Sequence, residues 1–379
     1  MKISRLMSCA VFGLAALCVL PAVAADYRVD LLLAPDGQAP GPTRETAAHA
    51  INNAGQIAGW TYNSAGDGLQ QAAMWNGGLT ATTLDPFPGL PRSVSYGLNS
   101  AGQVVGFAVV NTAVYPQRPV LWNAGGTTSF DTQGGHHAVA YAINDHGQTV
   151  GASNSAASEW EQATLWNGTA ATTLTSLGGL TSEARDLNNA GQVVGYADTT
   201  SGASHATLWH NGTVTDLGTL GGAYSLATGI NEAGTIVGRA DAAGTGEAHA
   251  TMWSGGVLTD LGTLLGPHSG NFSSANAING VGDIVGLSSD GQDGTLATLW
   301  RGGVAIDLNS LLDPQFAAAG WRLSGALDIN DHGAIVGTAV NDTLGAYAGY
   351  VLTPIPEPET VVLMLAGLGL LGAAARRKA

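Results

Sequence analysis

The sequence predicts an all-β fold, a seven-bladed β-propeller whose blades are four-stranded repeats of about 45 residues. Three observations support this prediction. A nine-residue phrase recurs seven times, for example as INNAGQIAG at 51–59 and INDHGAIVG at 329–337. A large aromatic residue follows every phrase at a nearly fixed distance. Finally, a lone strand at the start of the chain complements a last repeat that is one strand short.

The recurring phrase predicts a hairpin. Apolar residues alternate on both sides of an Asn-x-x-Gly turn, in which Asn suits the first position and Gly the last. We expect the asparagine side chain to bond the backbone two residues further on, which makes it a structural turn residue. The alternative is a ring of carboxamides that binds a glycan or a metal. The seven asparagines are Asn52, Asn99, Asn144, Asn188, Asn231, Asn279 and Asn330.

The aromatic residue marks a third strand. It stands 20 to 23 residues after the asparagine, and at that constant phase it is expected to fill the space between blades. A fourth strand follows, as in residues 213–217 after the turn Asn211-Gly212. Four strands in about 45 residues are typical of one propeller blade. The aromatic residues are Trp75, Trp122, Trp166, Trp209, Trp253, Trp300 and Tyr350.

The two ends of the repeat region predict closure of the ring. Residues 27–31 have the pattern of a fourth strand with no first three before it, and the last copy ends with its third strand at 350–352. We expect the leading strand to complete the last blade, because this pairs two otherwise bare strand edges. The alternative, an open solenoid, would need capping units that the sequence does not provide.

The first 25 residues predict a secretion signal. Two basic residues precede the apolar run 9–20, and Ala22-Val23-Ala24 gives the small-residue pattern of a cleavage site. An uncleaved anchor is the alternative, but the run is short for a bilayer span. A lipoprotein signal is disfavoured because an extra Leu precedes Cys18. The propeller is therefore assigned to residues 26–352 of an exported chain.

Composition excludes several classes of protein. Residues 26–354 contain eight arginines, no lysine and 26 acidic residues, a net charge of −18 that repels nucleic-acid phosphates. Both cysteines lie in the predicted signal, so no disulfide or thiol nucleophile is expected in the mature chain. The histidines of different repeats are not expected to converge, and no catalytic phrase is present. We therefore expect no metal, no cofactor and no enzymatic activity.

The C-terminal residues 353–379 have three parts in a fixed order. Pro356, Glu357 and Pro358 come first, the apolar run 361–375 follows, and the chain ends with Arg376, Arg377 and Lys378 before Ala379. The apolar run predicts a short helix of about 22 Å at about 1.5 Å per residue. It can enter a membrane with its basic end on the cytoplasmic side, which leaves the propeller outside.

This tail resembles a PEP-CTERM sorting signal. The resemblance implies that an exosortase, a membrane cysteine protease of Gram-negative bacteria, cleaves near residues 356–358. It also implies export, with signal peptidase acting at the other end of the chain, and transient anchorage in the inner membrane. The alternative is a permanent tail anchor.

The repeats resemble the extracellular HAF-type repeat, named for a His-Ala-Phe tripeptide. The phrases at 204–222 and 216–240 carry the resemblance, which covers about residues 45–352. The sequence departs at the namesake, where His205-Ala206-Thr207 keeps His-Ala but not Phe. The family implies an exported repeat protein and no known reaction.

Together these observations predict a non-enzymatic structural or interaction module of the cell surface or extracellular matrix, with exopolysaccharide or other matrix components as partners. One alternative is a lectin-like propeller, for which Trp60, Trp160 and Trp321 are candidate stacking residues because they break the aromatic phase. A less favoured alternative is a glycoside-active enzyme, for which Glu159 and Glu161 are candidate acids.

Overall fold

The computed structural model describes residues 26–63, 68–109, 117–244, 246–266, 270–292 and 294–355. The predicted signal peptide, residues 1–25, lies outside the described residues. So do the predicted sorting residues Pro356, Glu357, Pro358, Arg376, Arg377 and Lys378 and the helix between them. Within the described ranges, no helix has the length and apolar character needed to cross a membrane.

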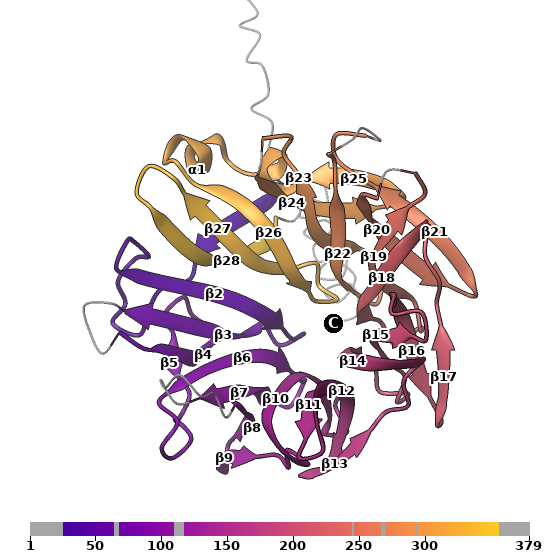
Figure 1. Cartoon of the computed structure of the whole chain (residues 1–379). Coiled ribbons are helices and arrows are strands. Elements are labelled where there is room, and N and C mark those ends of the chain that lie inside the picture. The colour runs from indigo at the N-terminus through magenta and orange to yellow at the C-terminus, as the bar shows by residue number, and fades with distance from the viewer. Residues whose placement is uncertain are drawn as a thin grey trace, which may run out of the picture.

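Seven separate four-stranded antiparallel sheets surround a central axis, which confirms the predicted seven-bladed propeller (Figure 1). Within each sheet the strands follow chain order from the axis outward, apart from the last blade, whose fourth strand is the first strand of the chain. Consecutive blades are therefore joined by a connection from an outermost strand to the next innermost strand.

Blade 1 contains β2 (Arg44–Ile51), β3 (Gln56–Asn63), β4 (Gln70–Asn76) and β5 (Thr82–Thr83). Blade 2 contains β6 (Arg92–Leu98), β7 (Val104–Val109), β8 (Gln117–Asn123) and β9 (Gly126–Ser129). Blade 3 contains β10 (Gly134–Ile143), β11 (Gln148–Ser155), β12 (Ser158–Asn167) and β13 (Ala170–Thr173). Blade 4 contains β14 (Gly178–Leu187), β15 (Val193–Thr199), β16 (Ser204–His210) and β17 (Thr213–Asp216). Blade 5 contains β18 (Gly221–Ile230), β19 (Ile236–Ala242), β20 (Ala248–Ser254) and β21 (Val257–Gly262). Blade 6 contains β22 (Ser273–Ile278), β23 (Ile284–Ser289), β24 (Thr295–Arg301) and β25 (Val304–Asp307), and blade 7 contains β26 (Arg322–Ile329), β27 (Ile335–Asn341), β28 (Ala346–Pro354) and β1 (Tyr27–Leu31).

The leading strand closes the ring as predicted. β1 pairs antiparallel with β28, with Tyr27 opposite Pro354 and Leu31 opposite Tyr350. Tyr27 is buried in the core shared by blades 6 and 7. Because β1 occupies the outer edge of blade 7, it joins the two chain ends through backbone hydrogen bonds and removes an exposed edge.

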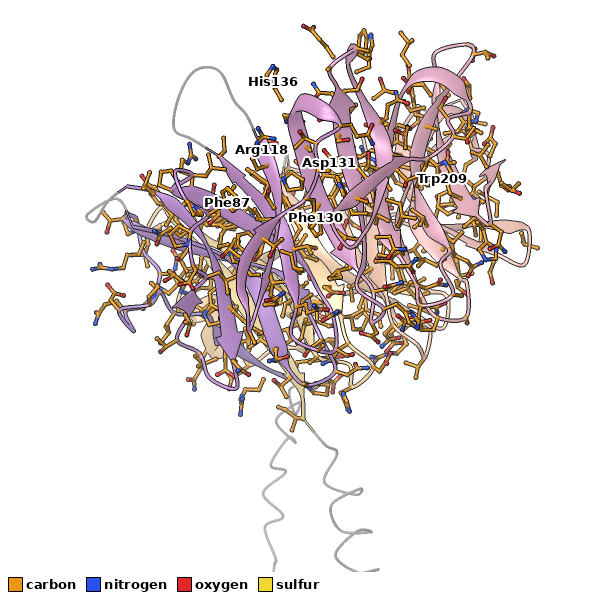
Figure 2. The ribbon with its side chains drawn as sticks, turned by 90° about the horizontal axis from the view of Figure 1, so that it is seen from below. Phe87, Arg118, Phe130, Asp131, His136 and Trp209 are labelled. Atoms are coloured by element: carbon orange, nitrogen blue, oxygen red, sulfur yellow. The ribbon has the colours of Figure 1, made fainter. Side chains whose placement is uncertain are left out.

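The repeated aromatic residues fill the space between blades. All seven are buried, and five of the six indole N–H groups bond to carbonyl oxygens of preceding connections, as from Trp166 to Asp131 at 2.8 Å and from Trp209 to Thr175 at 2.6 Å; Nε1 of Trp300 has no partner among the described residues. Trp209, Phe130 and Asp131 lie within the body of the ring in Figure 2. Five of the tryptophans thus combine apolar burial with a hydrogen bond to the connection that precedes their blade.

The last glycine of each phrase is required by close packing. A Cβ placed on Gly195 would lie 1.9 Å from the carbonyl oxygen of Glu183 on the first strand of the same blade. The same conflict, at 1.9 to 2.1 Å, occurs at Gly59, Gly106, Gly151, Gly238, Gly286 and Gly337. No other residue type fits there without a shift of the backbone, so every copy of the phrase ends in glycine.

Two short helices separate blades 6 and 7. The 3₁₀ helix η1 (Leu308–Leu311) and α1 (Pro314–Ala318) lie between β25 and β26. The side chains of Asp307 and Asp313 accept backbone N–H bonds at their N-termini, as capping residues do. This insertion explains why the interval from Asn279 to Asn330 is the longest between repeats.

Candidate functional site

The propeller has two faces. The seven Asn-x-x-Gly turns form one end of the axis, which we call the ring face. The opposite end, which we call the cavity face, carries the loops that join the second and third strands of each blade. Both described chain ends are tied to each other, since Ile355 N–H bonds to the carbonyl of Asp26 at 2.9 Å. They lie toward the ring face, because Pro354 approaches the turn at Gly333.

The seven turn asparagines form a closed circle of hydrogen bonds on the ring face. Each side-chain N–H group donates to the backbone carbonyl of the asparagine in the next blade, at 3.0 to 3.2 Å. Each side-chain oxygen accepts the N–H of the residue four positions on, and in five copies also that of the residue two positions on. The carboxamides therefore have structural partners at both ends.

Two aspartates stand just inside this circle. Five blades have Ala or Gly two residues before the ring asparagine, whereas blades 4 and 7 have Asp186 and Asp328. Each carboxylate accepts a backbone N–H from the next blade at 2.8 Å, from Ile230 and Ile51 respectively. Burial raises the pKa of each aspartate to about 7, against the effect of these hydrogen bonds.

A β-bulge in every blade points a variable residue toward the axis. In blade 4 the register shifts between Ala184 and Asp186, so that Arg185 is unpaired, and the equivalent shift occurs in all seven first strands. The residues so placed line a central cavity of about 170 Å³. They are His49, Tyr96, Tyr141, Arg185, Thr228, Asn276 and Leu327.

The sequence analysis did not identify these seven residues, because it treated the first strands as uninterrupted. We call the central cavity that they line the channel. A signal was present: three residues before each ring asparagine the residue type varies widely, while its neighbours in the repeat are mostly small. Variation inside an otherwise constant repeat is typical of positions whose side chains are not needed to form the repeat and differ in role from one blade to the next.

Aromatic rings and one guanidinium occupy the side of the channel that blades 1 to 4 form. Tyr96 stacks on His49 with ring centroids 5.0 Å apart and contacts Tyr141 at 5.3 Å. The guanidinium of Arg185 lies 4.5 Å from the centre of the Tyr141 ring, a cation–π contact. Burial lowers the pKa of His49, so its ring is held neutral.

A group of partly buried ionisable side chains lies next to Arg185, in blades 3 and 4. The Glu183 carboxylate pairs with Arg185 at 3.1 Å. Burial and then the charge of Glu183 raise the pKa of Tyr196, which keeps that hydroxyl protonated. Next to this group His137 pairs with Glu161; the pairing raises the pKa of His137 and lowers that of Glu161.

A larger cavity opens on the cavity face between blades 4 and 5. It has a volume of about 550 Å³, and Arg185 belongs to its lining as well as to that of the channel. Tyr196 and Arg239 follow the close-packed glycines of β15 and β19, and Tyr224 and Asp241 stand nearer the rim. The cavity therefore combines two guanidinium groups, two phenol rings and one carboxylate.

The three candidate stacking tryptophans lie apart. Trp160, at the start of β12, is 56% exposed. Trp60 in blade 1 is half-buried and stacks on Tyr347 of blade 7 at 6.4 Å. Trp321 follows α1 and packs against the core of blades 6 and 7. Trp160 is thus the one of the three that presents most of its ring to solvent.

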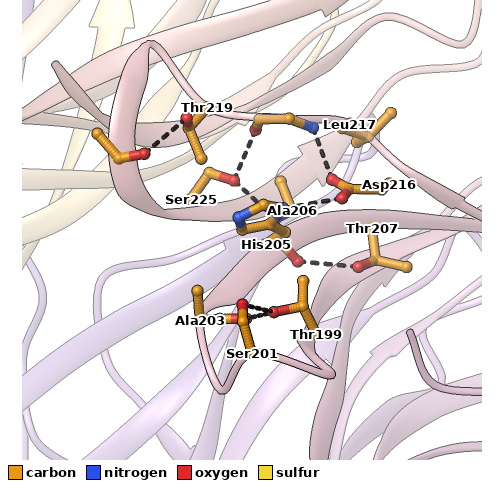
Figure 3. A network of polar contacts seen from close by, with 12 residues as sticks. Thr199, Ser201, Ala203, His205, Ala206, Thr207, Asp216, Leu217, Thr219 and Ser225 are labelled. Carbon is orange, nitrogen blue, oxygen red and sulfur yellow. Dashed lines mark hydrogen bonds and ion pairs between the residues drawn. The ribbon is translucent and has the colours of Figure 1, made fainter. Parts of the chain in front are cut away.

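The histidines of the His-Ala phrase contact an aspartate on the fourth strand of the same blade. His205 Nδ1 lies 2.8 Å from Asp216 Oδ2, and Ser225 of the next blade bonds to both the N–H of Ala206 and the carbonyl of Gly218 (Figure 3). The same contacts recur one blade later with His249, Asp260 and Ser273. Across the described ranges, no group of three or more His, Cys, Asp or Glu side chains is placed to hold a metal ion.

Fold and site together define a closed propeller with the ring face at one end of the axis and the cavity face at the other. Comparison with protein families matches residues 354–378 to the PEP-CTERM protein-sorting motif. This supports the predicted tail and implies export and processing by an exosortase. The likeness of the repeats to HAF-type repeats stays a prediction. No curated protein matches the chain.

Two solved structures are similar in part. A mutant of AofleA from Arthrobotrys oligospora with three arginine-to-alanine changes is 11% identical, with 74% of this chain and 88% of that chain covered and a TM-score of 0.40. The β-propeller domain of the Trilobed protease from Pyrococcus furiosus is 9% identical, with 67% and 93% covered and a TM-score of 0.37.

Proposed function

We propose that this protein is an exported, non-enzymatic interaction module, carried at the bacterial surface and attached or released there by processing of its C-terminal tail. The observation that carries the proposal is the PEP-CTERM motif at 354–378, which begins at the last residue of β28. The repeated polar groups support a structural use, because the ring asparagines and the His-Asp pairs are engaged in bonds within and between blades.

The position of the chain ends gives the module an orientation. Ile355 leaves the body beside Asp26, toward the ring face, so a tail held in or near a membrane turns the ring face toward it. The cavity face, with Trp160 and the cavity between blades 4 and 5, then faces away from the membrane. His136, which is labelled in Figure 2, lies at the edge of the cavity face. Partners such as exopolysaccharide or other matrix components would meet this face first.

Cell fractionation tests the proposal. Three versions of the chain are compared: the full sequence, a version lacking residues 356–379, and a version with Pro356, Glu357 and Pro358 replaced by alanine. We expect the full chain in a surface or released fraction and the two variants in a different compartment. If the location of the protein is the same in all three cases, the sorting role of the tail is wrong.

A second candidate function is glycan binding by the cavity face. Two exposed aromatic rings favour it, Trp160 at 56% and Tyr224 at 54% exposure, because aromatic rings offer sugars a large contact area at low entropic cost. Trp160→Ala should lower binding on an array of neutral and acidic glycans, with Trp321→Ala as the comparison at a half-buried ring. A chain that binds no glycan on the array would rule this function out.

A further inference from the structure

We propose that the cavity between blades 4 and 5 binds the uronic acid unit of an acidic saccharide, with Arg239 and Arg185 as the groups that recognise its carboxylate. This inference rests on the proposed function, since it names the ligand class that an exposed interaction face would take. It depends on four features of the cavity: an unpaired guanidinium, a spare donor on Arg185, two phenol rings and one carboxylate.

The first feature is an unpaired guanidinium. Arg239 occupies the exposed side of β19, opposite Leu226 of β18 and Ala250 of β20. Among the described residues its side chain makes no ion pair and no hydrogen bond, so all five N–H donors are open to a ligand. Four of the eight arginines of the body, Arg92, Arg118, Arg239 and Arg322, form no ion pair among the described residues, and of these four Arg239 lines the cavity.

The second feature is a spare donor on Arg185. One terminal nitrogen pairs with Glu183 at 3.1 Å, but the Nε–H is buried and has no partner among the described residues. A buried donor without an acceptor costs free energy, which a bound oxygen would recover. The cation–π contact with Tyr141 fixes the position of this guanidinium before a ligand arrives.

The third feature is the pair of phenol rings. Tyr196 lies on the blade 4 side of the cavity and Tyr224 on the blade 5 side. Tyr196 is held neutral, so it acts as an apolar wall with a hydroxyl rather than as a negative charge. Two rings on opposite blades suit a compact ring with an apolar C–H face, such as the chair of a pyranose sugar.

The fourth feature is a single carboxylate in the lining. The carboxylate of Asp241 accepts the backbone N–H of Tyr224 at 3.2 Å, as Asp198 does from Thr181 in blade 4. Asp241 therefore has a structural role in the loop, and it also lines the cavity. A ligand here must offer acceptors to the arginines and donors to Asp241. A sugar with both a carboxylate and hydroxyl groups meets this requirement, since planar carboxylates fit the arginine fork.

The site belongs to this junction alone. At the position of Arg239 the other blades have Trp60, Phe107, Ala152, Tyr196, Leu287 and Thr338, none of which is charged. At the position of Arg185 no other blade has an arginine. The repeat therefore builds seven similar junctions, and variable positions place two guanidinium groups at one of them.

Isothermal titration calorimetry on the full chain tests the inference. The probe is tetragalacturonate, and the matched neutral control is its methyl ester, which has the same backbone without free carboxylates. We expect binding of the acid, at least tenfold weaker binding of the ester, and weakening of the acid's binding as salt is raised. Arg239→Gln should weaken binding of the acid about tenfold or more, as expected for loss of a charge-assisted bond.

Arg92→Gln is the control variant. Arg92, on β6 of blade 2, also makes no ion pair or hydrogen bond among the described residues, but it does not line the cavity. It should leave binding unchanged. Equal loss in the two variants would show a general charge effect and overturn the site. Equal binding of ester and acid, or tighter binding of a sulfated galactan tetrasaccharide or of hexaglutamate, would overturn the ligand class.

The two proposals fail in different experiments. If tail deletion changes the location of the protein but tetragalacturonate does not bind, the ligand assignment is wrong and the surface module stands. If tail deletion has no effect on location, the surface role fails whatever the calorimetry shows.

Discussion

The side-chain amide of Asn330 donates a hydrogen bond to the backbone carbonyl of Asn52 at 3.0 Å, across 278 residues of sequence. This bond joins the last copy of the repeat to the first and completes the circle of seven asparagines. Together with the pairing of β1 and β28, it gives the ring two independent closures, one at the axis and one at the outer edge. These two features, with further bonds between blades 7 and 1 such as that from Ile51 N–H to Asp328, hold shut a body without disulfides.

The circle predicts a stability cost for each asparagine. Asn188→Ala removes the bonds to the carbonyl of Asn231 at 3.1 Å and from the N–H of Gln192 at 3.1 Å; the N–H of Gln192 loses its acceptor, while the carbonyl of Asn231 keeps the N–H of Gly234 at 3.0 Å. We expect a loss of about 2 to 3 kcal/mol in the free energy of unfolding, measured in urea. The control is Asn211→Gly at a hairpin turn with φ of 51°, where glycine fits the backbone. Equal stability of Asn188→Ala and the parent would contradict the role of the circle.

The packed glycines predict a steric effect. Gly195→Ala places a Cβ 1.9 Å from the carbonyl oxygen of Glu183, so the first two strands of blade 4 must separate. We expect destabilisation by more than about 2 kcal/mol, or failure to fold, as for other overpacked sites. Gly78→Ala is the control, because its Cβ would meet nothing within 4 Å. A small change, below about 0.5 kcal/mol, is expected there by thermal unfolding.

The indole hydrogen bonds can be separated from apolar burial by a matched pair. Trp166 donates to the carbonyl of Asp131 at 2.8 Å, whereas Nε1 of Trp300 is buried with no partner among the described residues. Trp166→Phe and Trp300→Phe remove a similar amount of buried ring. Trp166→Phe should therefore cost about 1 kcal/mol more in urea unfolding. The reverse order would show that the hydrogen bond contributes nothing at this junction.

The two inner aspartates predict a pH dependence of stability. Their pKa of about 7 in the folded chain is above the ordinary value of 3.8. Below pH 3.8 both states bind the proton equally, so the stabilisation is complete there; it is lost as the pH rises through about 7. His137, with a raised pKa, acts in the same direction near neutral pH, and His49, with a lowered pKa, acts in the opposite one.

Comparison of variants isolates the aspartate contribution. Asp186→Ala copies the residue type of three other blades, which have Ala50, Ala142 and Ala277, and should flatten the decline of the urea midpoint between pH 5 and pH 8. Asp198→Ala, at a carboxylate on the cavity face that bonds the N–H of Thr181, is the control for loss of one acceptor. If both variants keep the slope of the parent, burial does not raise the pKa of Asp186 in the way the structure indicates.

Much of the fold followed from periodicity in the sequence. A turn such as Asn188–Gly191 recurs with an aromatic residue in constant phase, and these local patterns are enough to place hairpins, third strands and the number of blades. The pairing of 27–31 with the last blade could also be predicted, because an unpaired edge on one end matched a missing strand at the other. These inferences work because turn geometry and side-chain alternation depend on near neighbours.

The candidate site did not follow in the same way. Arg185 and Arg239 stand 54 residues apart, in different blades, and neither belongs to the phrases that define the repeat. They line one cavity because a bulge turns the first inward and because β19 presents the second toward the same junction. The sequence by itself determined the architecture of this protein, through contacts repeated in every blade. The tertiary structure alone decided which variable side chains meet, because that depends on how neighbouring sheets are placed around the axis.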